Sequence, residues 1–191
     1  SFYQNIEKPW APEGFETGFE QFKIDTPSNT VNKLTSENIT FEESDRYIKI
    51  FNGRISYSFD KAYACVHSIT GFGKEMLYKP IEIKLWRAPN YNLTDTAKSW
   101  QDAGLEHIKQ KSYSCEIVKY NDKILVVEAN ISLGGPSVTP VIKATVLYSF
   151  IAGGDLVITV NGVVAENVPP LPRIGLEIVM PEGYEDMHYF G

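Results

Sequence analysis

The feature that most restricts the fold of this chain is a series of short strand-like runs separated by turn residues. Arg46–Phe51 and Arg54–Phe59 flank Asn52-Gly53, a pair in which both residues tolerate the positive φ of a type I′ turn. In the run Lys123–Leu133 the alternate positions Leu125, Val127, Ala129 and Ile131 are all apolar, as expected for a strand with one buried face. Such a pattern favours antiparallel hairpins.

Several further runs have the same character and are bounded by turn or loop residues. We predict these additional strands: Ile39–Glu43, Ala62–Thr70, Glu75–Leu85, Tyr113–Tyr120, Val141–Ile151, Leu156–Val160, Arg173–Met180 and His188–Phe190. The turns between them are expected at Gly71–Lys74, Asn121-Asp122, Ala152–Asp155 and Asn161-Gly162. Pro169–Pro172 should end the ladder, because proline has no N–H to donate to it. The predicted fold is mostly β, an antiparallel β-sandwich with one short helix.

The one segment with a helical pattern is Thr96–Lys109. Its apolar residues, Trp100 among them, recur three to four positions apart, and Thr94 or Asp95 can cap the free N–H groups of the first turn. Gly104 lies inside the pattern, where glycine costs about 1 kcal/mol relative to alanine. We therefore expect a helix that is short, bent or split.

The beginning of the chain differs from the rest. Residues 1–13 contain two prolines and should form an extended connector. Gly14–Ile24 fits a strand for which no partner lies nearby in the sequence, and Asp25–Thr30 has the composition of a linker. We place a domain boundary there, so that residues 1–25 form the first part and residues 26–191 the main domain.

Charge and composition exclude several classes of partner. The net charge of this 191-residue chain is −6 and its basic residues do not cluster, which argues against nucleic-acid binding. No apolar stretch approaches the roughly 20 residues that span a bilayer, so we expect no membrane partner. Cys65 and Cys115 lie far apart, with no metal-site or disulfide spacing, which predicts free thiols in a reducing compartment, the cytoplasm.

No arrangement typical of catalysis is recognisable. The three histidines are scattered, and no His or Cys spacing of a metal site occurs, so we expect no cofactor within this chain. The candidates for a carboxylate pair are Glu42, Glu43, Asp95, Glu182, Glu185 and Asp186. Glu42 and Glu43 are strand neighbours that point to opposite faces, and the others lie in predicted turns. Gly71–Glu75 lacks the spacing of a phosphate-binding loop and fits a hairpin turn.

A cluster of sugar-compatible residues occurs in the stretch that precedes the helix. Trp86, Arg87, Asn90 and Asn92 combine an aromatic face with groups that hydrogen-bond hydroxyls, and they are our candidates for carbohydrate binding. The structural alternative has Trp86 buried, Arg87 pointing inward and paired, and the asparagines capping turns.

The stretch Leu85-Trp86-Arg87-Ala88-Pro89-Asn90-Tyr91-Asn92 resembles the C-terminal sandwich of the large β-galactosidases of glycoside hydrolase family 2. Other resemblances follow in the family's order: Gly14–Phe22, Tyr47–Ile50, Gly71–Glu75, Trp100–Leu105, Pro172–Leu176 and Tyr189–Gly191. The ordered set covers nearly the whole chain. One departure is that Tyr91-Asn92-Leu93 stands where the family has Asp-Asn-Asp.

The resemblance implies that this chain is a fragment of a longer enzyme. Residues 1–25 would be a connector and the terminal strand of a preceding Ig-like domain. Residues 26–191 would be the N-terminal part of a galactose-mutarotase-like supersandwich. The family's two catalytic glutamates and its Mg²⁺ and Na⁺ ligands belong to a barrel domain outside this chain. No catalytic role can therefore be carried over to a residue here.

Three functions follow as hypotheses. The first is a non-catalytic segment of a β-galactosidase that supports the barrel, the wall of the cleft and the subunit contacts, with the remainder of the parent chain and a galactoside as partners. The second is a carbohydrate-binding module. The third is a mutarotase-like enzyme, for which His67 and Glu128 are the candidate acid and base. Exposed sheet edges in a cut sandwich also predict self-association.

Overall fold

The computed structural model of the chain describes residues 1–20, 38–53, 55–89, 94–136 and 139–186. The chain divides into two compact units, Ser1–Lys33 and Leu34–Gly191. The first unit contains two short strands, and the second contains every other described element.

In the first unit, β1 (Phe2–Tyr3) pairs antiparallel with β2 (Glu16–Gly18). The predicted strand in this region therefore does have a partner, and the expectation of a plain connector before it is wrong. The physical reason is a tight reversal in which the backbones of Lys8 and Ala11 hydrogen-bond each other and return the chain to β1. The origin of residues 1–25 in an Ig-like domain stays a prediction.

The first layer of the second unit is a five-stranded antiparallel sheet in the order β3-β4-β5-β6-β7. Its strands are β3 (Ile39–Glu43), β4 (Tyr47–Asn52), β5 (Ile55–Asp60), β6 (Cys65–Gly71) and β7 (Lys74–Glu75). The hairpin predicted around Asn52-Gly53 exists, and Gly53 has a φ of 56°. Asn52, however, is paired with Ile55 in the ladder, so its predicted role as a turn residue is wrong.

The second layer is a four-stranded antiparallel sheet in the order β12-β11-β10-β9. Its strands are β9 (Lys109–Asn121), β10 (Ile124–Gly134), β11 (Ile142–Ile151) and β12 (Asp155–Val164). The turn predicted at Asn161-Gly162 is wrong, because both residues pair with β11 inside β12. A Cβ on Gly162 would lie 3.1 Å from the side chains of Ala144 and Ile142, so close packing accounts for this glycine.

The predicted strand Glu75–Leu85 is broken into separate pieces. β7 pairs with β6, whereas β8 (Glu82–Lys84) pairs with β13 (Gly175–Glu177) near the end of the chain. One carboxylate oxygen of Glu75 accepts the backbone N–H groups of Ile69, Met76 and Leu77, at 2.9 to 3.1 Å, and so replaces the ladder at that point. These bonds, with one from Ser68, outweigh partial burial and lower the pKa of Glu75.

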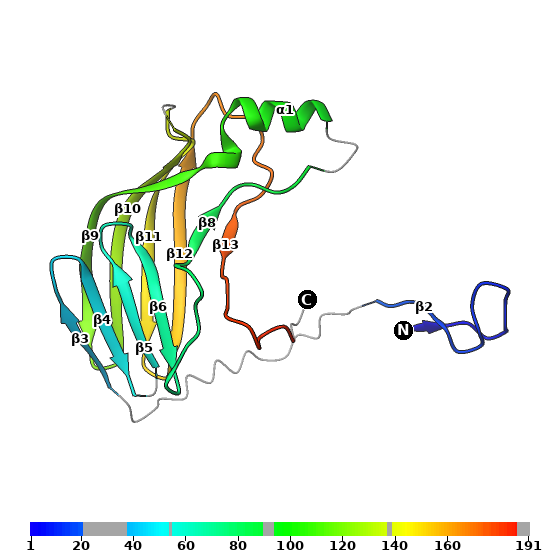
Figure 1. Cartoon of the computed structure of the whole chain (residues 1–191), viewed down its shortest axis with the longest axis horizontal. Helices are drawn as coiled ribbons and strands as arrows, with labels where there is room; N and C mark the ends of the chain where they lie inside the picture. Colours follow the sequence, from blue (N-terminus) through cyan, green and yellow to red (C-terminus); the bar gives the residue numbers. More distant parts are fainter. Residues whose placement is uncertain (21–37, 54, 90–93, 137–138, 187–191) are drawn as a thin grey trace. The chain divides into compact units, whose positions relative to one another are not determined.

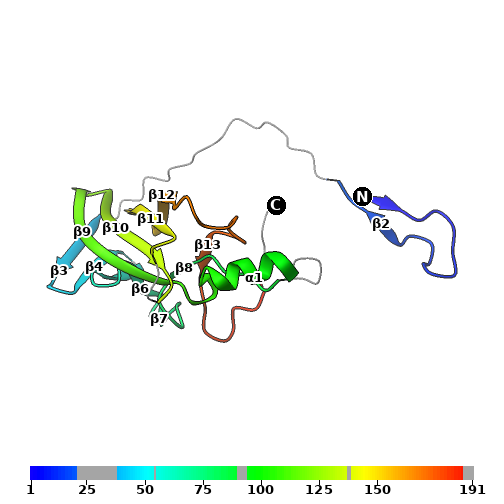
Figure 2. The same cartoon turned by 90° about the horizontal axis from the view of Figure 1, so that it is seen from above.

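The two layers face each other around one core, as Figures 1 and 2 show. The ring centroids of Tyr57 and Phe150 lie 5.1 Å apart across the layers, and those of Phe59 and Tyr148 lie 4.8 Å apart. In β10 the alternate residues from Leu125 to Leu133 are all buried, as their pattern predicted. The predicted antiparallel β-sandwich is confirmed.

The helical segment is split, as Gly104 predicted. Helix α1 (Thr94–Asp102) is followed by the 3₁₀ turn η2 (Leu105–His107), and Gly104 between them has a left-handed φ of 69°. The side chain of Trp100 is buried, and its Nε1–H donates a hydrogen bond of 2.8 Å to the carbonyl of Pro170. Figure 1 shows α1 at one end of the sandwich. The side chains of Thr94 and Asp95 lie outside the described part.

Replacing Asn52 with alanine should lower the free energy of unfolding by about 2–4 kcal/mol. The side chain of Asn52 is 2% exposed; it donates to the carbonyl of Ile151 at 2.7 Å and accepts the N–H of Gly153 at 3.1 Å. The substitution leaves both groups without these bonds. Urea unfolding followed by circular dichroism measures the loss.

The matched control is Asn130→Ala. The side chain of Asn130 is exposed and bonds the hydroxyls of Ser114 and Thr145 on β9 and β11. Water can replace these bonds, so the expected loss is below about 1 kcal/mol. Equal losses of unfolding free energy in the two variants would show that the hydrogen bonds of Asn52 between the layers stabilise the fold no more than exposed ones do.

Candidate functional site

The predicted carbohydrate-binding stretch is only partly described. Trp86 is half-buried, with its ring 6.3 Å from that of Trp100 in an edge-to-face arrangement. Arg87 is exposed and lies 6.0 Å from the Trp100 ring, so the expectation of an inward, paired Arg87 is wrong. Trp100 takes the buried position there. Asn90 and Asn92 lie outside the described residues, and sugar binding at this stretch stays a prediction.

The structure does not bring His67 and Glu128 together. The ring of His67 contacts Tyr47, which lies on the outer face of the first sheet. Glu128 lies between the buried residues Val127 and Ala129 of β10, so it points to the outer face of the second sheet. An acid and a base on opposite outer faces cannot act on one sugar.

Two of the candidate carboxylates, Glu43 and Glu185, are engaged in other contacts, and the side chain of Asp95 lies outside the described part. Glu43 forms an ion pair of 2.9 Å with Lys61, and Glu185 accepts the N–H of Gly183, which lowers the pKa of Glu185. Glu42 pairs with Lys49 in the ladder between β3 and β4. Within the described residues, no group of three or more His, Cys, Asp or Glu side chains is placed to hold a metal ion.

A pocket of about 350 Å³ lies between β6, the segment Pro80–Lys84 and the start of β9. Its apolar wall is formed by Cys65, Pro80, Ile81, Ile83 and Ile108. The size is in the range of sites that hold small molecules. Sequence reasoning missed this pocket, because its residues come from four segments that only the fold brings together.

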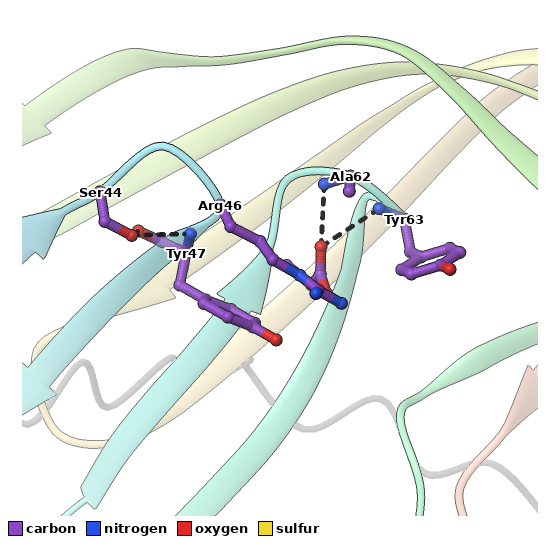
Figure 3. A network of polar contacts seen from close by, with 6 residues as sticks. Ser44, Arg46, Tyr47, Ala62 and Tyr63 are labelled. Atoms are coloured by element: carbon purple, nitrogen blue, oxygen red, sulfur yellow. Dashed lines mark hydrogen bonds and ion pairs between the residues drawn. The ribbon is translucent and has the colours of Figure 1, made fainter.

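The polar side of the pocket is organised by Arg46 and Asp60. Asp60 Oδ2 accepts hydrogen bonds from Arg46 Nε and Nη2, at 3.1 and 3.0 Å. The guanidinium lies 5.1 Å from the ring centroid of Tyr47 and 6.0 Å from that of Tyr63. Figure 3 shows Arg46 between these two tyrosines. The bonds to Asp60 raise the pKa of Arg46 and fix the direction of its charge.

Asp60 is held by the local sequence as well as by Arg46. It ends β5, and its Oδ1 accepts the N–H groups of Ala62, at 2.8 Å, and Tyr63, at 3.3 Å, as in an Asx turn. The residue is 1% exposed, whereas the Arg46 side chain is 55% exposed. Both oxygens of Asp60 are therefore occupied, and the charge that faces the pocket is that of Arg46.

Two further ionic groups of the pocket, Glu82 and Lys84, form ion pairs. Glu82 contacts Lys84 and Lys79, and both lysines also contact Glu177 of β13. The hydrogen bond from Lys79 lowers the pKa of Glu177. Lys109 also lines the pocket; it is exposed and forms no ion pair with any described residue. Both carboxylates, Glu82 and Glu177, are engaged in ion pairs with Lys79 and Lys84.

The thiol of the pocket is unsuited to nucleophilic chemistry. Burial is the main cause that raises the pKa of Cys65 to about 12, and the nearby Asp60 adds to it. A neutral thiol is a poor nucleophile and a poor metal ligand. The fold and this pocket thus define an antiparallel β-sandwich domain.

Comparison with known proteins identifies the family. A sequence model described as "Beta galactosidase small chain" matches residues 52–191, and the chain belongs to this family. The chain is similar to the β-galactosidase of Actinobacillus pleuropneumoniae, with 27% identity over 91% of the chain, and to that of Staphylococcus xylosus, with 26% identity over 94%. The β-galactosidase of Lactobacillus delbrueckii subsp. bulgaricus is 26% identical over 96% of the chain.

The same comparisons show how much of a relative this chain represents. It spans 18% of the length of each of these three β-galactosidases. The resemblance to the family 2 sandwich drawn from Trp86-Arg87-Ala88-Pro89 and the other segments is confirmed. No helix of the described residues has the length and apolar character that crossing a bilayer requires.

The two cysteines should react slowly with a thiol reagent in the folded chain. Burial raises the pKa of Cys65 to about 12 and that of Cys115 to about 11. At pH 8 the thiolate fraction is then ~10⁻⁴ for Cys65 and ~10⁻³ for Cys115, compared with ~0.2 for an exposed thiol. Colorimetric titration with a disulfide reagent measures both rates.

The same titration in denaturant is the control. Unfolding removes the burial, so both thiols should then react at the rate of a free cysteine. Because the pKa values are raised in the fold, the rate in native buffer should rise as the pH is increased from 8 to 10. Fast reaction of two thiols per chain at pH 8 in native buffer would contradict the placement of Cys65 and Cys115.

Proposed function

We propose that this chain is a non-catalytic part of the sandwich domain of a β-galactosidase, which as a whole removes terminal β-D-galactose residues. The observation that carries the proposal is the family match over residues 52–191 in a chain that spans only 18% of its relatives. The ion pairs of Glu43, Asp60, Glu82 and Glu177 support it. The domain would support the barrel, the wall of the cleft and the subunit contacts, with the galactoside bound mainly elsewhere.

The remainder of the parent chain is the partner that we propose first. Strand β12 is ten residues long and pairs with β11 alone among the described strands. Its residues Val157, Val163 and Val164 are exposed, and so are Leu176 and Ile178 in and after β13. A free strand edge beside exposed apolar residues suits further strands or a subunit contact.

Metal ions and location belong to the same proposal. The Mg²⁺ and Na⁺ sites expected for a whole family 2 enzyme would lie in the remainder of the parent chain, because the described residues offer no fitting ligand group. We place the protein in the cytoplasm. Two free cysteines, Cys65 and Cys115, are compatible with its reducing conditions.

A carbohydrate-binding module is the second candidate. The exposure of Arg87 beside the half-buried Trp86 favours it, since both side chains have surface available to a sugar. Calorimetric titration with galactose and lactose tests it, and binding should be lost in Trp86→Ala if this stretch is the site. A mutarotase-like activity is not favoured, because His67 and Glu128 lie on opposite outer faces.

The 191-residue chain should not hydrolyse a chromogenic β-galactoside. Retaining hydrolysis needs two carboxyl groups about 5–5.5 Å apart, one of them free to donate a proton. Release of the chromophore is measured against buffer and against a whole β-galactosidase. Turnover that disappears in Glu182→Gln or Glu185→Gln would overturn the proposal, since it would place catalytic groups in this chain.

The isolated chain should self-associate through β12. Light scattering at increasing concentration should show dimers or larger species. Val163→Lys should weaken them, because Val163 is 76% exposed on β12 and a charge there opposes edge-to-edge contact. Val118→Lys is the matched control, on the edge strand β9 of the same sheet. A monomer at high concentration, or equal effects of the two variants, would contradict this assignment.

A further inference from the structure

We propose that the pocket beside β6 is a binding site for a small acidic saccharide, with Arg46 as the group that holds its anionic substituent. The inference concerns this chain alone. It does not rest on the role proposed for the chain within a β-galactosidase. The site differs from the Trp86–Asn92 stretch, since none of residues 86–89, the described part of that stretch, lines the pocket.

The first step concerns the direction in which Arg46 presents its charge. Asp60 accepts hydrogen bonds from Nε and Nη2 on one edge of the Arg46 guanidinium. The rings of Tyr47 and Tyr63 lie near the same guanidinium. A guanidinium has five N–H donors, so donors remain, and no described residue accepts a hydrogen bond from Nη1. Such a fixed fork matches the geometry of a carboxylate or phosphate group.

The second step concerns the surroundings of that fork. Asp60 is buried, and its oxygens already accept two backbone N–H groups and the Arg46 side chain, so it does not compete for the ligand's hydroxyls. Gln110 is tied to the wall, because its Nε2 donates to the carbonyls of Tyr63 and Ala64. The polar side of the site is thus built before a ligand arrives, which reduces the entropy cost of binding.

The third step concerns charge. Three cationic side chains, Arg46, Lys84 and Lys109, and two anionic ones, Asp60 and Glu82, line the pocket, which gives an excess of one positive charge. The chain as a whole carries a net charge of −6. A local excess of positive charge on an acidic protein favours an anionic ligand over a neutral or cationic one.

The fourth step concerns the uncharged part of the ligand. Ile81, Ile83 and Ile108 form an apolar wall, and the ring of Tyr63 is largely exposed at the side of the pocket. A sugar ring has an apolar C–H face that can pack on such surfaces, while its hydroxyls meet His67, Lys109 and Gln110. The volume of about 350 Å³ accommodates one or two sugar rings rather than a bare ion.

The direct test is calorimetric titration of the 191-residue chain with four compounds. Galacturonate and galactose 6-phosphate carry the proposed anion as a carboxylate or a phosphate, galactose lacks it, and acetate lacks the sugar. We expect at least one acidic sugar to bind at least ten-fold more tightly than galactose and acetate. Equal binding of galactose, equal binding of acetate, or no binding of any acidic sugar at millimolar concentration would overturn the proposal.

Three variants locate the site. Arg46→Lys keeps the charge beside Asp60 but loses the fork, and should weaken the acidic sugar about ten-fold. Lys109→Gln removes a lining cation that has no ion-pair partner among the described residues, and should weaken binding of the acidic sugar several-fold. Lys111→Gln is the matched control, because Lys111 is also exposed on β9 and does not line the pocket. It should leave binding unchanged.

Two readouts keep the result independent of folding. Circular dichroism shows whether each variant is folded, and Lys109→Gln changes only an exposed side chain. In the wild-type chain, nuclear magnetic resonance titration with the tighter acidic sugar should shift the signals of Arg46 Nε and of the amides of Tyr63 and Gln110. Shifts confined to other residues, or equal weakening by Lys109→Gln and Lys111→Gln, would overturn the assignment.

Discussion

The aromatic contact between the two sheets is the interaction on which the rest of this structure depends. Tyr57 packs on Phe150 and Phe59 on Tyr148, and each tyrosine hydroxyl ends in a hydrogen bond to a carbonyl of the opposite layer. The hydroxyl of Tyr148 reaches Ala64, which has a φ of 50° in the turn between β5 and β6. The same turn supplies the N–H groups that hold Asp60. Packing between the layers therefore sets the position of the pocket.

The layers could be predicted from the sequence because alternation and turn composition are local properties. The buried positions of β10 and the split at Gly104 follow directly from them. The errors arose where a residue's partner is distant in the sequence. Asn52 has the composition of a turn residue, but its hydrogen bonds go to Ile151 and Gly153 on the other sheet. Gly162 also has the composition of a turn residue, yet the side chain of Ala144 on β11 accounts for it.

The pocket was less accessible to sequence reasoning than the fold. The turn at Asp60 could have been predicted from the sequence. An aspartate that follows a strand often accepts the N–H of the residue two positions later, here Ala62, and so forms an Asx turn. The pairing of Asp60 with Arg46 depends on the register between β4 and β5. Ile81 and Ile108 are distant in the sequence and line the same pocket only because the chain folds back on itself. The composition instead predicted a binding site at the Trp86 and Arg87 stretch, where aromatic and polar residues are neighbours in the sequence.

The hydrogen bonds and ion pairs of Asp60 and Glu177 suit these carboxylates to holding other groups in place rather than to transferring protons. A catalytic acid or base needs an oxygen free to exchange a proton, and an environment that moves its pKa toward neutrality. Here the oxygens of Asp60 are occupied, and Lys79 holds the pKa of Glu177 below its ordinary value. These groups fix the positions of their partners, as Asp60 does for Arg46. On the role proposed above, this sandwich would orient a ligand or a neighbouring domain, and the two carboxyl groups of a retaining hydrolysis would come from the remainder of the parent chain.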